Sequence, residues 1–348
     1  MNSVIKILIV DDSAYVRNII ERILMISPFI EVVGKARDGK EALDMVEELS
    51  PDVVLLDLIM PEMDGITFIK AQMKRKIIRI IVVSIVSPEG KLLIEALNIG
   101  AIDFIQKPTS LATEQISEIR DELIQKIKSA AVANLNHLNK IYHQTSQHKK
   151  ISEIIAFKGK SDVIVIGIST GGPQALRYLI PQFPVNFPVP IVIVLHMPEG
   201  YTEMYSQNLN EISAIQVKEA KEGDQLLPET VTIASAGFHL TFLKDAQNRI
   251  LFHLDRQPDD TLHRPSADIL FQSAVEVFKE RVLGIVMTGM GSDGKEGAAW
   301  IKANGGIVLT ESKDSCVIYG MPRAVDEAAL SDRCVPLDQM ARIIKDLI

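Results

Sequence analysis

The chain has 348 residues, of which 47% are hydrophobic and 24% are charged, a composition typical of a globular protein with two domains. Its net charge of −8 is unevenly spread along the chain. Residues 1–125 contain 14 basic residues (Lys and Arg) and 20 acidic residues (Asp and Glu), and residues 161–348 contain 16 basic and 24 acidic residues. The segment between them, residues 126–160, contains 7 basic residues and 1 acidic residue. Two acidic regions joined by a basic connector argue against nucleic-acid binding, because neutralising phosphates requires clustered cations.

The apolar runs are strand-sized and fall well short of the roughly 18 residues that a membrane helix needs. The N-terminal sequence enters a strand pattern directly and carries no signal-peptide pattern. Cys316 and Cys334 have no CxxC spacing, which argues against a metal or redox pair. We therefore expect a cytoplasmic protein with no direct membrane insertion.

Strand and helix patterns alternate through the first 125 residues. The helical segments have apolar residues at three- and four-residue spacing, which indicates amphipathic helices between buried strands and favours a doubly wound parallel sheet. The strand-like runs lie at residues 4–10, 31–34, 53–56, 80–83 and 102–105.

The alternation stops in a polar segment, and residues 124–160 are predicted to form a linker. The first part of this segment can also extend the preceding helix. Its basic residues could bind an acidic surface, but a solvated connector is the simpler interpretation. Its histidines lack the cysteine or carboxylate neighbours of a metal tract.

A second alternating series fills residues 161–348 and predicts a second doubly wound parallel sheet. Helices are expected over residues 266–280 and 296–306. An antiparallel hairpin is expected around HLTFLKDAQNRILFHL, with its turn at residues 245–248. The expected strands of the sheet lie at residues 162–167, 190–195, 231–234, 282–287 and 306–309.

Polar side chains follow the expected strands of the first sheet. Asp11 and Asp12 follow one strand and Asp57 follows another, so three carboxylates are expected to converge at one sheet edge. Such a cluster favours a hard cation such as Mg²⁺. Ser84 and Lys107 end two further strands and could bind phosphate oxygens while Asp57 acts as a nucleophile toward a phosphoryl group.

The motifs IVDDS, LLDLIMPEMDG and DFIQKP resemble those of the response-regulator receiver domain, over residues 1–123. The resemblance implies a flavodoxin-like fold and Mg²⁺-dependent phosphorylation of Asp57 by a histidine kinase. It also implies that the backbone carbonyl of Ile59 binds the metal, and that Ser84 and Phe104 form the switch pair. Phe104 has no hydroxyl group, so any switching there must occur by packing.

The stretch VIGISTGGP follows an expected strand and admits two interpretations. A phosphate-binding loop is excluded, since neither G-x-G-x-x-G nor G-x-x-x-x-G-K-[ST] is satisfied. The alternative pattern, G-x-S-x-G, is satisfied with Ser169 at its centre. The glycines permit a sharp turn that presents this serine as a nucleophile.

A nucleophilic serine needs a base and an orienting carboxylate. His196 and Asp293 each follow an expected strand and should lie at the same sheet edge as Ser169. The backbone N–H groups of Thr170 and Met290 are the candidate oxyanion hole. The order serine, histidine, aspartate differs from that of the α/β-hydrolases. The remaining histidines of this half of the chain are predicted to be surface or structural residues: His239, His253 and His263. Alternatively, His239 and Arg264 could line the substrate cleft.

From about residue 162 to residue 340 the chain resembles the catalytic domain of the chemotaxis protein-glutamate methylesterases, through IGISTGGP, LHMP, EGDQLLPETVTIA, HRPSADILF, MTGMGSDG and VIYGMPRAV, and the catalytic domain is assigned to residues 161–348. The resemblance implies a Rossmann-like domain that hydrolyses glutamate γ-methyl esters on chemoreceptors and deamidates glutamines, with no cofactor at the esterase site. It places the triad at Ser169, His196 and Asp293. We also expect the protein to be a monomer. Ser235 and Lys295 depart from the family pattern, and Lys295 could alter the rim of the cleft.

Two other functions are open to test. A response regulator that binds DNA would need a helix-turn-helix with a basic recognition helix, which the acidic region 161–348 does not contain. A non-enzymatic adaptor with a relict site would keep the same motifs, and only an assay of a Ser169→Ala variant separates it from an enzyme.

Overall fold

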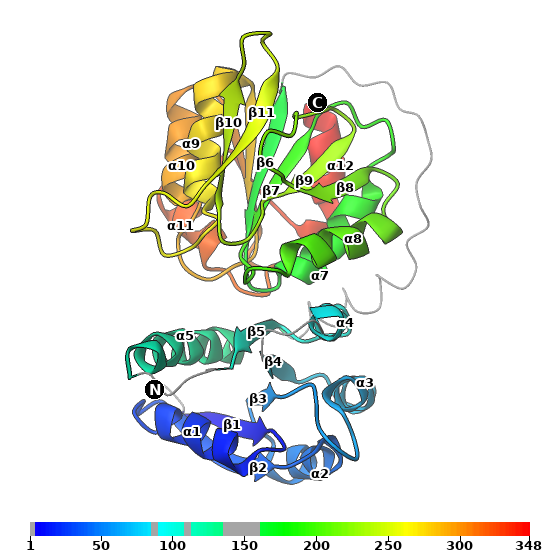
Figure 1. The fold of residues 1–348 in the computed structure, drawn as a ribbon, viewed down its shortest axis with the longest axis vertical. Coiled ribbons are helices and arrows are strands. Elements are labelled where there is room, and N and C mark those ends of the chain that lie inside the picture. The colour runs from blue at the N-terminus through cyan, green and yellow to red at the C-terminus, as the bar shows by residue number, and fades with distance from the viewer. Residues whose placement is uncertain (1–3, 85–89, 108–112, 135–160) are drawn as a thin grey trace. The chain divides into compact units, whose positions relative to one another are not determined.

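The computed structural model describes residues 4–84, 90–107, 113–134 and 161–348, with only the backbone of residues 113–119. It divides into two compact units, Met1–Tyr142 and His143–Ile348, which are considered separately (Figure 1). No helix within these described ranges is both long enough and apolar enough to cross a membrane.

The first unit is a five-stranded, wholly parallel sheet in the order β2-β1-β3-β4-β5. Helices α1 and α5 cover one face, and α2, α3 and α4 cover the other (Figure 1). This confirms the predicted doubly wound fold. The elements are β1 (Ile5–Val10), α1 (Ala14–Leu24), β2 (Ile30–Ala36), α2 (Gly39–Leu49), β3 (Val53–Leu56), α3 (Gly65–Arg75), β4 (Arg79–Ser84), α4 (Gly90–Asn98), β5 (Asp103–Gln106) and α5 (Thr113–Ala131).

Local sequence explains where these helices begin. Ser13 caps α1 by accepting from the backbone N–H of Val16, and Asp38 caps α2 through the N–H groups of its first turn. Strands β1 and β3 are buried on both faces, which explains why they appear in the sequence as continuous apolar runs rather than alternating ones.

Helix α5 continues well into the segment assigned to the linker. It runs unbroken to Ala131, and the side chains of Ile127 and Ala130 are buried in the core between α5 and the sheet. The helical extension allowed by the sequence is therefore present through Ala131. Of the remainder of the predicted linker, residues 135–160 lie outside the described residues.

The second unit has a seven-stranded, wholly parallel sheet in the order β14-β13-β12-β6-β7-β9-β8, and a separate antiparallel hairpin, β10-β11. Its elements are β6 (Val163–Ile168), α7 (Gly172–Leu179), β7 (Ile191–Leu195), α8 (Thr202–Ile212), β8 (Gln216–Glu219), β9 (Thr230–Ile233), β10 (His239–Lys244), β11 (Ile250–Asp255), α9 (Ala267–Phe278), β12 (Val282–Val286), α10 (Lys295–Ala303), β13 (Ile307–Glu311), α11 (Met321–Glu327), β14 (Arg333–Val335) and α12 (Leu337–Leu347), with short 3₁₀ helices at Ile180–Gln182 and Lys279–Arg281.

Helices α9, α10 and α11 pack on one face of this sheet, and α7, α8 and α12 lie on the other (Figure 1). The predicted parallel sheet and hairpin are both confirmed, with Phe242 opposite Phe252 in the hairpin. Two strands, β8 and β14, were not predicted. Both are short edge strands with exposed or half-buried side chains, such as Gln216 and Arg333, and lack the apolar run that identifies a central strand.

Candidate active site and phosphoacceptor site

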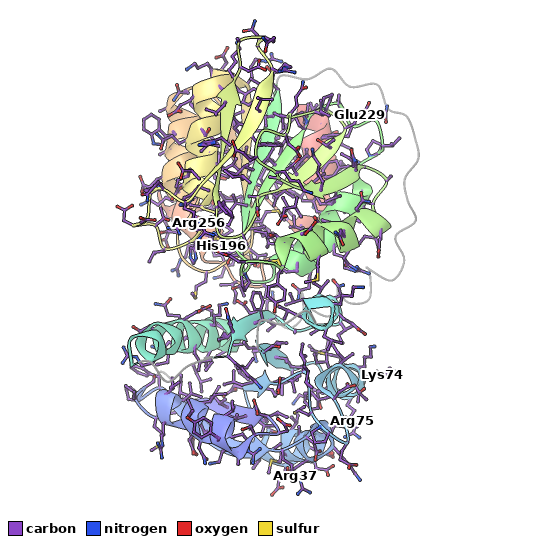
Figure 2. The ribbon with its side chains drawn as sticks, viewed as in Figure 1. Arg37, Lys74, Arg75, His196, Glu229 and Arg256 are labelled. Atoms are coloured by element: carbon purple, nitrogen blue, oxygen red, sulfur yellow. The ribbon has the colours of Figure 1, made fainter. Side chains whose placement is uncertain are left out.

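The candidate catalytic residues follow the three central strands of the second sheet. Strand β6 lies between β12 and β7, and Ser169, Asp293 and His196 come after these three strands in turn. Parallel strands present their carboxyl ends at one edge, where ligands bind in this class of fold. His196 lies at this edge (Figure 2).

Ser169 lies in a tight turn between β6 and α7. Gly171 has φ of +78°, a left-handed conformation that favours glycine, and α7 begins at the next residue. The backbone N–H of Ser169 donates to the carbonyl of Thr288 at 3.0 Å. A Cβ added to Gly289 would lie 2.8 Å from Ser169 Cβ, so the loop after β12 passes directly against the serine.

His196 and Asp293 form a buried pair. His196 Nε2 lies 2.8 Å from Asp293 Oδ2, and each side chain is only 9% exposed. Burial alone would raise the pKa of Asp293, but the hydrogen bond and charge of His196, with backbone N–H donors, hold the pKa of this carboxyl far below its usual range. Asp293 is therefore suited to stay ionised and to stabilise a protonated imidazole.

The second ring nitrogen of His196 is buried and has no hydrogen-bond partner among the described residues. Because Asp293 occupies Nε2, Nδ1 is the nitrogen left to accept a proton from a nucleophile. No hydrogen bond joins it to Ser169 in this structure, a common state of catalytic pairs without substrate.

The start of α9 supplies a set of donors to Asp293 that the sequence analysis missed. Ser266 Oγ donates at 2.8 Å, and the backbone N–H groups of Ala267 and Asp268 donate at 2.7 and 3.0 Å. Burial, with a further contribution from the charge of Asp293, raises the pKa of Asp268 above its usual range. The serine at the helix start was the available signal, since such residues ordinarily cap their own helix.

His263 was also missed as a neighbour of the site. Its ring stacks on that of His196, with the centroids 4.0 Å apart and the planes at 24°. The sequence placed it in a polar loop, and nothing in its local pattern indicates that this loop returns to the end of β7. Its position makes it a wall of the site beside the candidate base.

The candidate oxyanion residues and the atypical lysine lie around this edge. Thr170 is buried, with its carbonyl accepting from Thr288 Oγ1 at 3.0 Å, and Met290 is half-buried in the loop after β12. Lys295 begins α10, and its ammonium lies 3.7 Å from Glu296 at the surface.

The carboxyl edge of the first sheet collects the predicted acids. The ammonium of Lys107 lies 2.7 Å from both Asp11 Oδ2 and Asp57 Oδ2. Burial raises the pKa of Asp57, although Lys107 opposes this shift. The same two carboxylates raise the pKa of Lys107 against the effect of its own burial, so the ammonium stays charged.

The acid cluster fits a divalent cation. Oxygen atoms of Asp11, Asp12 and Asp57 all lie within 4.8 Å of one another, and carboxylates are the donors that Mg²⁺ prefers. Ile59 is 53% exposed, and the backbone N–H of the preceding residue, Leu58, donates to Asp57 Oδ1 at 2.8 Å.

The predicted switch residues lie on the two neighbouring strands. Ser84 ends β4, and its carbonyl accepts from the N–H of Lys107 at 2.7 Å. Phe104, in β5, is buried, and the ammonium of Lys126 sits over its ring, 4.9 Å from the centroid. The packing of this aromatic ring is thus coupled to a cation on α5.

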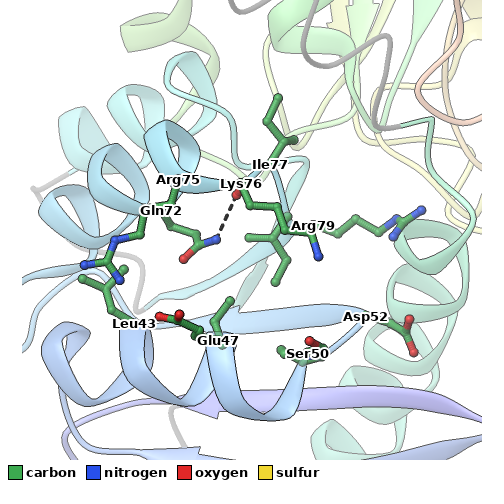
Figure 3. A pocket seen from close by; sticks show the side chains of 12 residues that line it. Leu43, Glu47, Ser50, Asp52, Gln72, Arg75, Lys76, Ile77 and Arg79 are labelled. Atoms are coloured by element: carbon green, nitrogen blue, oxygen red, sulfur yellow. Dashed lines mark hydrogen bonds between the residues drawn. The ribbon is translucent and has the colours of Figure 1, made fainter.

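A cavity of about 720 Å³ lies at the opposite edge of the first sheet, near the start of β4 (Figure 3). It opens where α2 and α3 end, away from Asp57, and so takes no part in either site described above. Its lining residues include Leu43, Glu47, Ser50, Asp52, Gln72, Arg75, Lys76 and Arg79.

Comparison with known proteins assigns a family to each unit. Residues 164–344 match the CheB methylesterase family model, and residues 7–119 match the response regulator receiver domain. The crystal structure of the Thermotoga maritima CheB methylesterase catalytic domain is 38% identical with a TM-score of 0.53, covering 54% of this chain and 99% of that one.

Relatives similar over their full length carry one name. Protein-glutamate methylesterase/protein-glutamine glutaminase 5 of Myxococcus xanthus is 43% identical, covering 99% of this chain and 98% of that one. The protein of the same enzyme name from Thermotoga maritima is 38% identical, covering 99% of both. The chain therefore belongs to the protein-glutamate methylesterase/protein-glutamine glutaminase family, with a receiver domain preceding the methylesterase domain.

Proposed function

We propose that this enzyme hydrolyses glutamate γ-methyl esters, and deamidates glutamines, on the helices of chemoreceptors, under control of phosphorylation. The observation that carries the proposal is the buried 2.8 Å pair of His196 and Asp293 at the sheet edge that also bears Ser169. The names of the relatives support the substrate class.

The arrangement accounts for an acyl-enzyme mechanism. Ser169 Oγ attacks the ester carbonyl while His196 Nδ1 takes its proton, and Asp293 stabilises the resulting imidazolium. Backbone N–H groups of Thr170 and Met290 stabilise the oxyanion. The intermediate collapses, methanol leaves with the proton from His196, and a water activated by His196 then releases glutamate. With a glutamine substrate the leaving group is ammonia.

The receiver domain supplies the control. A histidine kinase is the phosphodonor to Asp57, and Lys107 and Ser84 bind the oxygens of the phosphoryl group. Asp11, Asp12, Asp57 and the carbonyl of Ile59 would hold Mg²⁺, which supplies neutralisation of charge on the phosphoryl group. Changes at Phe104 proceed through its packing.

The protein is proposed to act as a cytoplasmic monomer that neither binds nucleic acid nor inserts in the membrane. The receiver domain is assigned to residues 1–123 and the catalytic domain to residues 161–348, with the intervening segment as a linker whose beginning is the last turns of α5. The esterase site is proposed to need no cofactor.

The direct test is methanol release from methylated receptor membranes, with and without a small-molecule phosphodonor. The wild-type protein should release methanol faster with the phosphodonor, and the Ser169→Ala variant should release none while its circular dichroism is unchanged. Equal release by Ser169→Ala would refute the nucleophile assignment and favour a different site.

A further inference from the structure

Thr288 binds the backbone on both sides of the candidate nucleophile. It lies two residues beyond β12 and is 1% exposed. Its carbonyl accepts from Ser169 N at 3.0 Å, and its Oγ1 donates to the carbonyl of Thr170 at 3.0 Å. The same hydroxyl accepts from the N–H of Ile318 at 3.0 Å, which ties in the loop after β13.

Thr288 is itself held by a buried acid. Glu311, the last residue of β13, is fully buried, and its Oε2 accepts from the backbone N–H of Thr288 at 2.9 Å. Its Oε1 accepts from Ser315 Oγ at 2.9 Å, and Ser315 Oγ also accepts from Leu337 N at 3.1 Å. Among the described residues, no basic side chain forms an ion pair with Glu311.

Such an arrangement is costly for a purely structural role. A carboxyl group buried without a cation opposes folding, and an apolar side chain of similar size usually serves a core at least as well. What the carboxyl group adds here is a fixed acceptor for one particular peptide N–H. That peptide belongs to the loop that also carries Met290 and Asp293.

We infer that Thr288 and Glu311 are positioning residues for ester hydrolysis. Glu311 fixes the peptide of Thr288, and Thr288 fixes the backbone of Ser169 and Thr170, so that the nucleophile and the oxyanion donors keep their separations during acylation. The inference rests on the proposed function, since it takes Ser169 as the nucleophile. It also assigns the oxyanion to other donors, because the N–H of Ser169 is already bound to Thr288.

A pair of substitutions at Thr288 tests this in the full-length protein. Thr288→Val keeps the shape and removes the hydroxyl group, whereas Thr288→Ser keeps the hydroxyl group. The measurements are the second-order rate of Ser169 phosphonylation by a small organophosphonate, and kcat and KM for methanol release. Thr288→Val should slow phosphonylation and lower kcat by roughly ten- to a hundred-fold with KM little changed, because small misplacements of reacting groups have effects of that size.

A matched control removes a buried threonine hydroxyl elsewhere. Thr230 is 4% exposed at the start of β9, and its Oγ1 donates to the carbonyl of Leu227 at 2.6 Å. It lies at the amino end of its strand, away from the candidate site. Thr230→Val should lower the melting temperature comparably and leave the phosphonylation rate of the folded protein unchanged.

A second pair, at Glu311, keeps the test decisive if Thr288→Val does not fold. Glu311→Gln retains an oxygen that can accept from the N–H of Thr288, and its amide can donate to Ser315. This variant should therefore keep most of the wild-type rate of phosphonylation. Glu311→Met fills the space without an acceptor and should lose rate as Thr288→Val does.

Two outcomes overturn the inference. In the first, Thr288→Val and Glu311→Met are phosphonylated at the wild-type rate. In the second, the rate of phosphonylation falls only in proportion to the loss of folded protein, and Thr230→Val shows the same fall. The Ser169→Ala variant separates these results from failure of the proposed function: if it still releases methanol, the nucleophile assignment is wrong. If it is inactive while Thr288→Val is normal, only the positioning role is wrong.

Discussion

Both sheets have buried acidic side chains at the edge where their strands end, but they stabilise these acids by different means. In the receiver domain, Asp11 and Asp57 share one cation, the ammonium of Lys107. In the catalytic domain, Asp293 is held by a hydroxyl group and backbone N–H groups as well as by His196, and the donors to Glu311 in the described part of the chain are neutral. One edge balances charge with charge, and the other relies largely on fixed dipoles.

The difference follows from what each edge must do. The proposed phosphorylation of Asp57 would add negative charge to the receiver edge for as long as the phosphoryl group stays bound, and a cation compensates such a change. At the esterase edge, the charges of the oxyanion and of the imidazolium would develop only during the proposed reaction. Dipoles that are already oriented stabilise such transient charge without reorganising, which makes them effective in catalysis.

The largest expected effect comes from removing the proposed nucleophile. Ser169→Ala should reduce methanol release by roughly 10⁶-fold, the size seen when a catalytic serine is removed in other hydrolases. Phosphorylation of Asp57 by a small phosphodonor, followed by a mobility-shift gel, should be unchanged. A loss of phosphorylation would break the comparison, because the two edges would then not be independent.

The next effect comes from the orienting acid. Asp293→Asn should lower kcat about 10⁴-fold, because the amide favours the wrong tautomer of His196 and cannot stabilise the imidazolium. The assay is methanol release at saturating substrate. A drop of less than tenfold would show that neutral donors around this position suffice without the carboxylate charge.

A moderate effect on stability is expected from Glu311. Burial raises the pKa of Glu311 from its ordinary value of 4.5 to about 7. Binding of its proton therefore stabilises the folded state fully below about pH 4.5, and this contribution is lost as the pH rises to about 7. The unfolding free energy of Glu311→Gln relative to wild type should therefore grow by about 3 kcal/mol between pH 4.5 and pH 8.

Urea titrations of both proteins across this range measure the difference. Other groups titrate alike in the two proteins and cancel. If the unfolding free energies of the two proteins changed with pH in the same way, the pKa of Glu311 would not be raised in the folded state. The difference between an acid paired with a cation and an acid paired with dipoles would then have no effect on stability.

The smallest effect on the esterase itself is expected from the receiver edge. Asp57→Asn, or chelation of Mg²⁺, should bring the rate with phosphodonor down to the rate without it, because no phosphoryl group can be accepted. Phosphonylation of Ser169 without phosphodonor should be insensitive to a chelator. Sensitivity there would place a metal requirement at the esterase edge and contradict the proposed absence of a cofactor.

Strand ends were the most informative feature of the sequence. Because parallel strands end at one edge, the positions of Ser169, His196 and Asp293 after buried runs were enough to predict that they share an edge, and the structure brings His196 and Asp293 into contact. The acids around Lys107 followed from the same rule. These arguments needed only periodicity and chain order.

Contacts that depend on loops returning from a distance could not be predicted in this way. The stack of His263 on His196, and the donors to Asp293 at the start of α9, join segments far apart in sequence. The polar edge strand β8 carried no apolar signal, and the continuation of α5 to Ala131 was only an alternative, because its buried face is visible only against the sheet.

The crossing of two loops at Gly289 and Gly320 has a consequence for sequence drift. A Cβ on Gly320 would lie 2.5 Å from the carbonyl oxygen of Gly289, and one on Gly289 would lie 2.4 Å from Met321 Sδ. Any side chain at either position would push this crossing apart, together with the adjoining Ser169. Neither glycine can therefore be exchanged alone, and we expect a saturation library selected for esterase activity to return glycine at both.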